Sequence, residues 1–182
     1  DAKKDAQRIA HLLWVYEFPW EFQRALEVAL YYTYGSDSVS RLLDRTGEMS
    51  KAGQKRYDDT AILIGLFIES GWDGDFGRRA IDRMNKTHGN YTIPNDDYLF
   101  VLWTFIEFPI WWTDNFGNRP MSDHEKLAWF SFWIGVGEQM NLKSIPQTKA
   151  EFDSFVRKYE DVHFVYNEAS RRVSDATVNI ME

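Results

Sequence analysis

The 182-residue chain contains no cysteine. This absence excludes disulfide bonds, thiolate nucleophiles, cysteine-bound zinc, iron–sulfur clusters and a haem held by a thiolate. The chain is also poor in positive charge, because 21 lysine and arginine residues stand against 28 aspartate and glutamate residues, a formal net charge of −7. A field of that sign repels phosphate, so nucleic acid is not expected as a partner.

Long apolar runs and strand signals are also missing. The longest greasy segment, residues 98–112, carries Glu107 and Pro109 and is shorter than the roughly 20 residues that a membrane-spanning helix needs. The pair Asp73-Gly74 lies between two helical patterns, not between alternating strands. Aromatic residues, by contrast, make up 16% of the chain. They could fill a thick core or line a pocket for a flat, apolar ligand.

Capping residues, glycines and apolar periodicity predict helices throughout. Residues 61–68 are apolar on all sides, which is typical of a helix buried all round. We see no internal repeat or linker, so we predict one all-α domain over residues 1–182, built around this central buried helix. The predicted helices cover residues 2–16, 19–34, 37–45, 50–71, 75–88, 95–112, 122–141, 148–165 and 168–181.

Four histidines are candidate metal ligands: His11, His88, His124 and His163. His163 belongs to a Glu-x-x-His pair of the kind that di-iron bundles use twice, but the chain has no second pair. His88 ends a predicted helix directly before Gly89, which allows a sharp turn and the close approach of a bulky group. A single neutral imidazole is the usual proximal ligand of a b-type haem. The alternative is that His88 caps the last carbonyls of its helix.

Arg56 and Thr60 lie four residues apart, so they share one helix face that leads into the buried run. An arginine that enters an apolar interior needs an anionic partner. A haem propionate, a buried aspartate or a substrate anion would serve. The alternative is a salt bridge to Asp59 or Asp82.

A series of short motifs, in this order, resembles the family of bacterial rubber oxygenases (latex-clearing proteins) and the fungal membrane-bound oxygenase of mycophenolic acid biosynthesis, and is closest to the fungal branch. The similarity covers most of the chain. The motifs are Glu17-Phe-Pro-Trp20, Ser40-Arg-Leu-Leu43, Arg45-Thr-Gly-Glu48, Arg56-x-x-x-Thr60, Arg83-Met-Asn-Lys-Thr-His88-Gly-Asn-Tyr91, Ile93-Pro-Asn-Asp96, Phe116-Gly-x-Arg-Pro120, Asp123-His-Glu-Lys126 and Glu168-Ala-x-Arg-Arg172.

The resemblance implies a haem b pocket between helices, with His88 as the iron ligand and O₂ used to cleave carbon–carbon double bonds of an isoprenoid or other hydrophobic substrate. It implies catalytic roles near the haem for Arg56 and Thr60, and we expect Arg56 and Arg83 to pair with a propionate. The rubber enzymes carry a lysine directly before that threonine, where this chain has Asp59. We therefore expect Asp59 to be a distal acid–base group, or the distal face to be open to O₂.

Further expectations concern location and competing functions. The fungal resemblance implies association with the endoplasmic reticulum membrane through segments outside this chain. One competing hypothesis is a non-enzymatic helical module that binds a hydrophobic small molecule. Another is a cofactor-free enzyme on the same scaffold, in which Asp58, Asp59 and Arg56 perform the acid–base chemistry.

Overall fold

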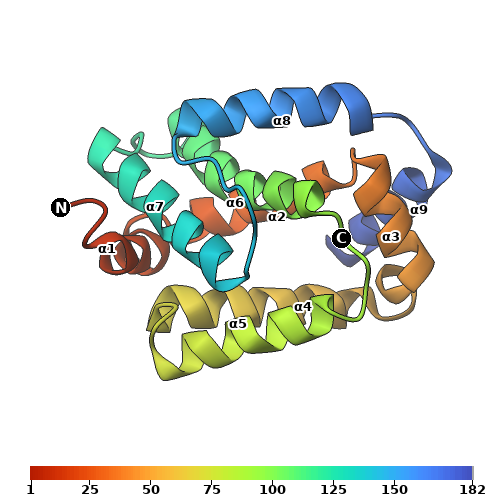
Figure 1. Cartoon of the computed structure of the whole chain (residues 1–182), viewed down its shortest axis with the longest axis horizontal. Helices are drawn as coiled ribbons and strands as arrows, with labels where there is room; N and C mark the ends of the chain where they lie inside the picture. Colours follow the sequence, from red (N-terminus) through yellow and green to blue (C-terminus); the bar gives the residue numbers. More distant parts are fainter. Residues whose placement is uncertain (182) are drawn as a thin grey trace.

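The computed structural model describes the backbone of residues 1–181 and the side chains of residues 1–179. Within this part of the chain there are helices and no strands, which confirms the predicted all-α class (Figure 1). The helices are α1 (Ala6–Leu12), a π-helical turn η1 (Leu13–Glu17), α2 (Pro19–Thr33), α3 (Asp37–Thr46), α4 (Glu48–Ser70), α5 (Asp75–His88), α6 (Asn95–Phe116), α7 (Asp123–Gln139), α8 (Lys149–His163) and α9 (Glu168–Met181).

Most predicted helix ends are confirmed within a few residues, and the reasons are local. Capping boxes form at Ser122 and at Thr148, where two of the predicted helices begin. The largest differences are at α1, which begins at Ala6 and not at Ala2, and at α6. Helix α4 starts two residues before Ser50 and is kinked at Ala52. Helix α6 continues four residues beyond the predicted end at Trp112.

Pro109 does not end α6 because its missing hydrogen bond is replaced. Proline has no N–H to donate to the carbonyl four residues earlier, here that of Phe105. That carbonyl instead accepts a hydrogen bond from Trp129 Nε1 at 3.1 Å. This hydrogen bond links α6 to α7, and it allows α6 to continue to Phe116.

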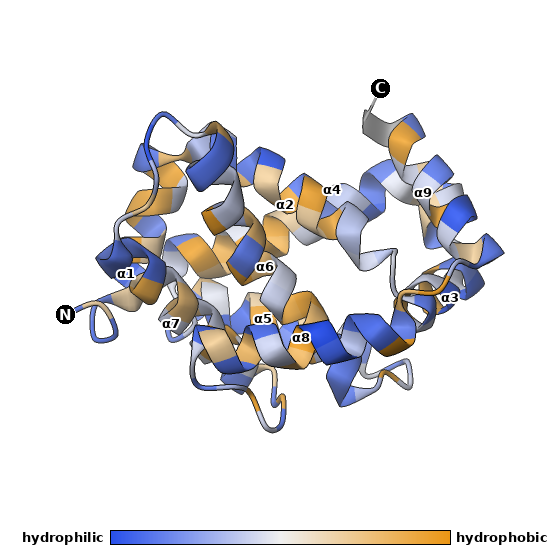
Figure 2. Cartoon of the chain, turned by 90° about the horizontal axis from the view of Figure 1, so that it is seen from above, coloured by the Kyte–Doolittle hydropathy of each residue, from blue (hydrophilic) through white to orange (hydrophobic). Residues whose placement is uncertain are grey.

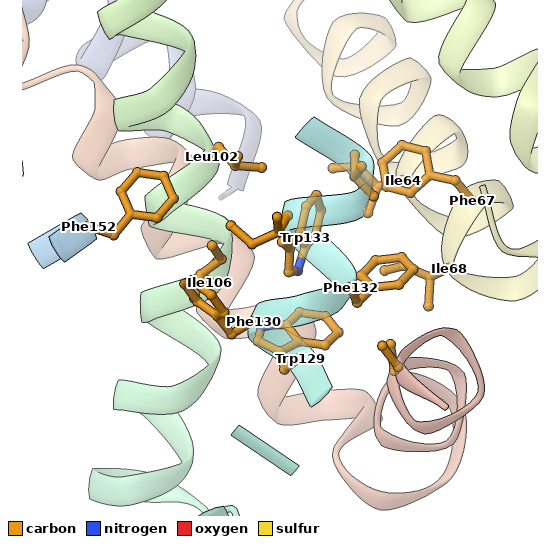
Figure 3. Packing of buried hydrophobic residues seen from close by; sticks show 14 of the residues in the cluster. Ile64, Phe67, Ile68, Leu102, Ile106, Trp129, Phe130, Phe132, Trp133 and Phe152 are labelled. Atoms are coloured by element: carbon orange, nitrogen blue, oxygen red, sulfur yellow. The ribbon is translucent and has the colours of Figure 1, made fainter. Parts of the chain in front are cut away.

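The central helix of the fold is α7, and not the run at residues 61–68. Ile62 in that run is 60% exposed, although Ile64, Phe67 and Ile68 are buried. Helix α7 is buried almost continuously from Ala128 to Gly137, and its aromatic side chains pack between α6 and α4 (Figure 3). An unbroken apolar sequence therefore did not identify the most buried helix, because one side of the run in α4, with Ala61 and Ile62, is exposed.

The last helix, α9, is amphipathic. Ala169, Val173 and Thr177 are buried at intervals of four residues, and α9 packs on α3 and α4 through this stripe. Figure 2 shows hydrophilic and hydrophobic residues interleaved along α9. Arg172 fixes the contact by donating two hydrogen bonds to the carboxylate of Asp44.

Three of the motifs that carry the family resemblance meet around one arginine. Arg119 donates to Glu125 at 2.8 Å and to Glu17 at 2.9 Å, and its guanidinium lies 4.7 Å from the ring centre of Phe18. These contacts of Arg119 join η1 to the start of α7. These motif residues therefore have a structural role.

The Arg119 pair predicts a stability change at acid pH. Hydrogen bonds from Arg119 lower the pKa of Glu125 to about 2. Because the folded value lies below the ordinary value of 4.5, the pair stabilises the fold fully above that ordinary value, and this contribution is lost as pH falls toward 2. We expect Glu125→Gln to lower the melting temperature at pH 7 and to have little effect near pH 2. Glu138→Gln, an exposed change on the same helix, is the control, and a constant deficit at both pH values would contradict the expectation.

Helices α4 and α5 form an antiparallel hairpin that carries His88 (Figure 1). The hairpin closes tightly because Gly77 has no side chain: a Cβ there would lie 1.9 Å from the carbonyl oxygen of Gly71. At Gly65, in the middle of α4, a Cβ would meet nothing within 4 Å.

Alanine substitutions at these two glycines should have opposite effects. Gly77→Ala should lower the free energy of unfolding by about 1–3 kcal/mol, since backbone must move to relieve the clash. Gly65→Ala should raise it by about 0.5–1 kcal/mol, because alanine loses less entropy in a helix interior. Urea unfolding followed by circular dichroism measures both values. Equal effects of the two changes would show that the hairpin is not tightly closed at Gly77.

Candidate functional site

His88 is the last residue of α5 and is half-buried. Its Nδ1 is fully buried and has no hydrogen-bond partner within the described residues. The ring lies 5.5 Å from the ring of Tyr98, between centroids, and borders an apolar pocket of about 70 Å³. The pocket is lined by Ile64, Phe67, Met84, His88, Tyr98, Val101, Leu102, Phe105, Trp133, Val136, Met140 and Leu142.

The environment of His88 favours the neutral imidazole. Burial lowers its pKa, and the positive charge of Arg56 lowers it further. A neutral ring has one nitrogen lone pair free for a metal ion. A buried, unpaired ring nitrogen is costly in an apolar pocket unless a ligand satisfies it. The side chain is therefore chemically suited to bind a metal.

The helix-cap alternative has no support in the hydrogen bonds. The His88 ring donates no hydrogen bond to a carbonyl within the described residues, and the His88 carbonyl itself accepts from Tyr91 N at 3.0 Å. Gly89 keeps right-handed helical geometry with φ −61°. The chain therefore turns at residues 89–90 without the left-handed conformation that a glycine after a helix often adopts.

A second, larger cavity of about 580 Å³ lies beside the His88 pocket. Ile64 and Phe105 line both cavities and form the wall between them. The larger cavity is bounded by η1, α2 and α4, and its size is within the range of about 300–1,000 Å³ that is usual for ligand pockets. Its lining residues are Trp14, Val15, Pro19, Gln23, Leu26, Glu27, Leu30, Tyr57, Asp58, Ala61, Ile64, Glu69 and Phe105.

Arg56 and Thr60 interact directly, as their spacing predicted. Arg56 Nη1 donates to Thr60 Oγ1 at 2.9 Å, and Thr60 Oγ1 donates to the Arg56 carbonyl at 3.0 Å. Neither of the expected salt bridges, to Asp59 or to Asp82, forms within the described residues. The guanidinium is near enough to His88 to affect its pKa, and in this part of the chain it has no carboxylate partner.

The remaining predicted site residues lie elsewhere. Asp59 is exposed and pairs with Lys55, and it borders neither cavity. Arg83 is also exposed and lines neither cavity. The side chain of Arg83 makes no ion pair among the described residues. The neighbour of Asp59 on α4, Asp58, does line the larger cavity.

Sequence reasoning missed two polar residues of the larger cavity, Glu27 and Tyr57. Tyr57 donates its hydroxyl to Glu27 Oε1 at 2.9 Å, and Arg24 pairs with the same carboxylate at 2.6 Å. Burial raises the pKa of Tyr57, with the Glu27 contact adding to the shift. Since these residues come from α2 and α4, 30 positions apart, no local spacing could have joined them.

The other described histidines line neither cavity, although Nδ1 of His11 is also buried without a hydrogen-bond partner within the described residues. His163 Nδ1 lies 3.1 Å from Asp37 Oδ1, and its ring packs on Tyr159. Across the described residues, no three histidine, cysteine, aspartate or glutamate side chains gather as a metal-binding group. A haem differs from such centres because it needs one protein ligand on one face of its iron.

Comparison with known proteins gives the family. The family described as "ER-bound oxygenase mpaB/B'/Rubber oxygenase, catalytic domain" matches residues 54–181. The ER-bound oxygenase mpaB of Penicillium roqueforti (strain FM164) is 31% identical over 183 residues, which cover 91% of this chain and 61% of the relative. The proteins mpaB and mpaB' of Penicillium brevicompactum are each 33% identical over 154 residues, 80% of this chain and 39% and 36% of those relatives.

The chain thus spans between 36% and 61% of the length of these relatives. No solved structure matches it significantly. The match covers α4 and α5, which carry Arg56, Thr60 and His88, and the predicted resemblance is confirmed. The chain belongs to the mpaB/rubber oxygenase family.

Proposed function

We propose that this chain is the catalytic part of a haem b-dependent oxygenase that uses O₂ to attack a carbon–carbon double bond in an isoprenoid or other hydrophobic substrate. The observation that carries the proposal is His88: a buried, neutral imidazole with an unpartnered nitrogen, facing an apolar pocket. It lies in a chain whose family is named for oxygenases.

The chemistry of His88 suits a haem iron. Its pocket of about 70 Å³ is smaller than a macrocycle, so haem binding would require Ile64 and Phe105, the wall shared with the cavity of about 580 Å³, to move aside. His88 would bind the iron, and Arg56, which has no carboxylate partner within the described residues, would pair with a propionate through charge-assisted hydrogen bonds. A bound haem would supply the activation of O₂.

The protein's own side chains would position the reactants and exclude water. Thr60 lines neither cavity, so it would act through its hydrogen bond with Arg56 by holding the guanidinium in position. Leu26, Leu30 and Phe105 would exclude water from the cavity. Asp58 lines the cavity, whereas Asp59 is turned to solvent, so Asp58 is better placed than Asp59 to transfer a proton.

Reconstitution tests this proposal. The purified protein is titrated with haemin, and the Soret band and stoichiometry are recorded. The loaded protein is then given a prenylated substrate, and oxygen uptake and carbonyl products are measured. A saturable Soret band near one haem per chain, with oxygen consumed in step with carbonyl formed, supports the oxygenase. Tight ligand binding without haem would instead favour the non-enzymatic module, and turnover without haem the cofactor-free enzyme.

We also propose that the protein works at the endoplasmic reticulum membrane, as the names of its relatives suggest for them. No helix in the described residues is long and apolar enough to cross a bilayer. A cluster of four aromatic residues at the start of α2 and the end of α6 offers a surface of the kind that lies at membrane interfaces. Trp20, Trp111 and Phe116 are 61%, 40% and 60% exposed, and Trp112 packs among them.

Removing this cluster should weaken membrane binding. We expect Trp111→Ser with Phe116→Ser to reduce co-sedimentation with phosphatidylcholine vesicles severalfold, because the rings bury apolar area in the headgroup region. The matched control is Val162→Ser with Tyr166→Ser. These two side chains are 67% and 73% exposed, and they lie in the last turn of α8 and in the loop that follows it. Equal binding by both variants would refute a role for the cluster.

A further inference from the structure

The surroundings of the His88 ring offer it no hydrogen-bond acceptor. Its Nδ1 is buried and unpartnered within the described residues, and the side chains that line its pocket include no aspartate, glutamate, asparagine or glutamine. Among the described histidines, only His163 has a ring nitrogen within hydrogen-bond distance of an acceptor, Oδ1 of Asp37 at 3.1 Å. This is unusual for a metal ligand, because a ligating histidine almost always donates its other ring N–H to a carboxylate, a carbonyl or a water.

The polar groups closest to the ring cannot supply the acceptor. Arg56 is near enough to act on His88, but a guanidinium has only donors. Tyr98 meets the ring through its own ring, with the planes inclined by 60° and the centroids 5.5 Å apart. Asn85, on the last turns of the same helix, donates its amide to the carbonyl of Gln139 at 3.1 Å. Whichever ring nitrogen of His88 binds a metal, the other one therefore keeps its proton without a partner among the described residues.

We infer that His88 gives little electron density to the iron that it binds, because no group accepts a hydrogen bond from its ring, and that it thereby favours the ferrous state of a bound haem. The inference rests on the proposed function in taking haem as the ligand of His88. An acceptor on the ring N–H makes an imidazole more basic, and a more basic ligand stabilises ferric iron. The apolar lining of the pocket acts in the same direction as the missing acceptor, since low polarity disfavours the more highly charged ferric form.

Resonance Raman spectroscopy of the haemin-reconstituted, reduced protein tests the strength of the bond between iron and imidazole. The reference is a haem protein whose proximal histidine donates to a carboxylate, recorded on the same instrument. We expect the iron–imidazole stretching band of this chain at a lower frequency than that of the reference, because its ring has no acceptor. A band at the same or a higher frequency would overturn the inference.

Variants of Met84 add the acceptor that the pocket lacks. Met84 lies four residues before His88 on α5, is half-buried and lines the same pocket. Helical side chains lean toward the N-terminus of their helix, so the His88 ring lies over residue 84. Met84→Gln places a neutral carbonyl beside the ring, and Met84→Glu a carboxylate.

Both acceptor variants should raise the frequency of the iron–imidazole band and shift the ferric–ferrous midpoint to a more negative potential in spectroelectrochemistry. The shift should be larger for Met84→Glu than for Met84→Gln, because a carboxylate is the stronger acceptor. Met84→Leu, which keeps an apolar side chain of similar volume, is the matched control and should change neither value. Since Met84→Gln adds no charge, it remains informative if the glutamate variant fails to fold. Equal spectra and potentials for Met84→Gln and Met84→Leu would overturn the inference.

Nuclear magnetic resonance of the haem-free protein separates the inference from the proposed function. With ¹⁵N-labelled histidine, we expect the ring N–H proton of His88 at the position of an imidazole without a hydrogen bond, and a downfield shift in Met84→Gln. A downfield proton in the unaltered protein would overturn the inference whether or not haem binds. Failure to form a Soret band would instead remove the haem proposal, and a normal Soret band with a strong iron–imidazole bond would leave that proposal standing without the inference.

Discussion

Replacing His88 with alanine is expected to abolish the Soret band of the haemin-reconstituted protein. The substitution removes the one described histidine that lines the apolar pocket, and with it a buried Nδ1 that has no hydrogen-bond partner within the described residues, so no other described histidine can take its place at that site. Affinity for haemin should fall by at least about a hundredfold, which corresponds to about 2.7 kcal/mol. Absorbance titration near the Soret maximum measures both the band and the affinity.

Two controls make the result specific. His124→Ala removes an exposed histidine at the start of α7 and should leave the band unchanged. Imidazole added to His88→Ala should restore part of the band, because the missing ring leaves space at the pocket. A full Soret band in His88→Ala without imidazole would show that another group holds the iron and would refute the ligand assignment.

Replacing Trp129 with alanine is expected to cause the largest loss of stability of any single change considered. Trp129 is fully buried, with ring centres 4.6 Å from Phe22 and 5.7 Å from Trp133. Deleting a buried tryptophan costs about 3–5 kcal/mol, a large part of the 5–15 kcal/mol typical of a whole domain. The change also leaves the Phe105 carbonyl, opposite Pro109, without its donor.

Guanidinium unfolding followed by far-ultraviolet circular dichroism measures this loss of stability. Circular dichroism is used because the substitution itself changes the tryptophan signal. Trp129→Phe keeps an aromatic ring and should cost less than the alanine variant, so the pair separates the ring volume from the hydrogen bond. Trp20→Ala, at a tryptophan 61% exposed, should change stability by less than about 1 kcal/mol. Similar losses at Trp129 and Trp20 would contradict the central position of α7.

Predictions about single residues were confirmed where they depend on residues close together in the sequence. The pairing of Arg56 with Thr60 followed from helical spacing, and the capping boxes at Ser122 and Thr148 followed from residues three apart. The sequence did not predict which way the side chain of Asp59 points. Neighbouring positions on a helix differ by about 100°, so Asp58 borders the cavity while Asp59 pairs with Lys55 in solvent.

For His88 the sequence and the structure contribute different facts. The sequence placed it at a helix end and, by resemblance, near an iron. The structure shows that its nitrogen is buried without a partner, that Arg56 is close enough to lower its pKa, and that a larger cavity adjoins its pocket. The first kind of fact depends on neighbours along the chain, and the second on side chains brought from four helices.

The sequence by itself determined the all-α class, most helix limits, the family and the pairing of Arg56 with Thr60, because each depends on local spacing or on ordered motifs. Only the tertiary structure decided which helix is most buried, since burial depends on what covers each face of a helix and α4 leaves one face uncovered. It also decided that Glu27 and Tyr57 share a cavity, because residues 30 positions apart meet only when the fold brings α2 and α4 to the same cavity.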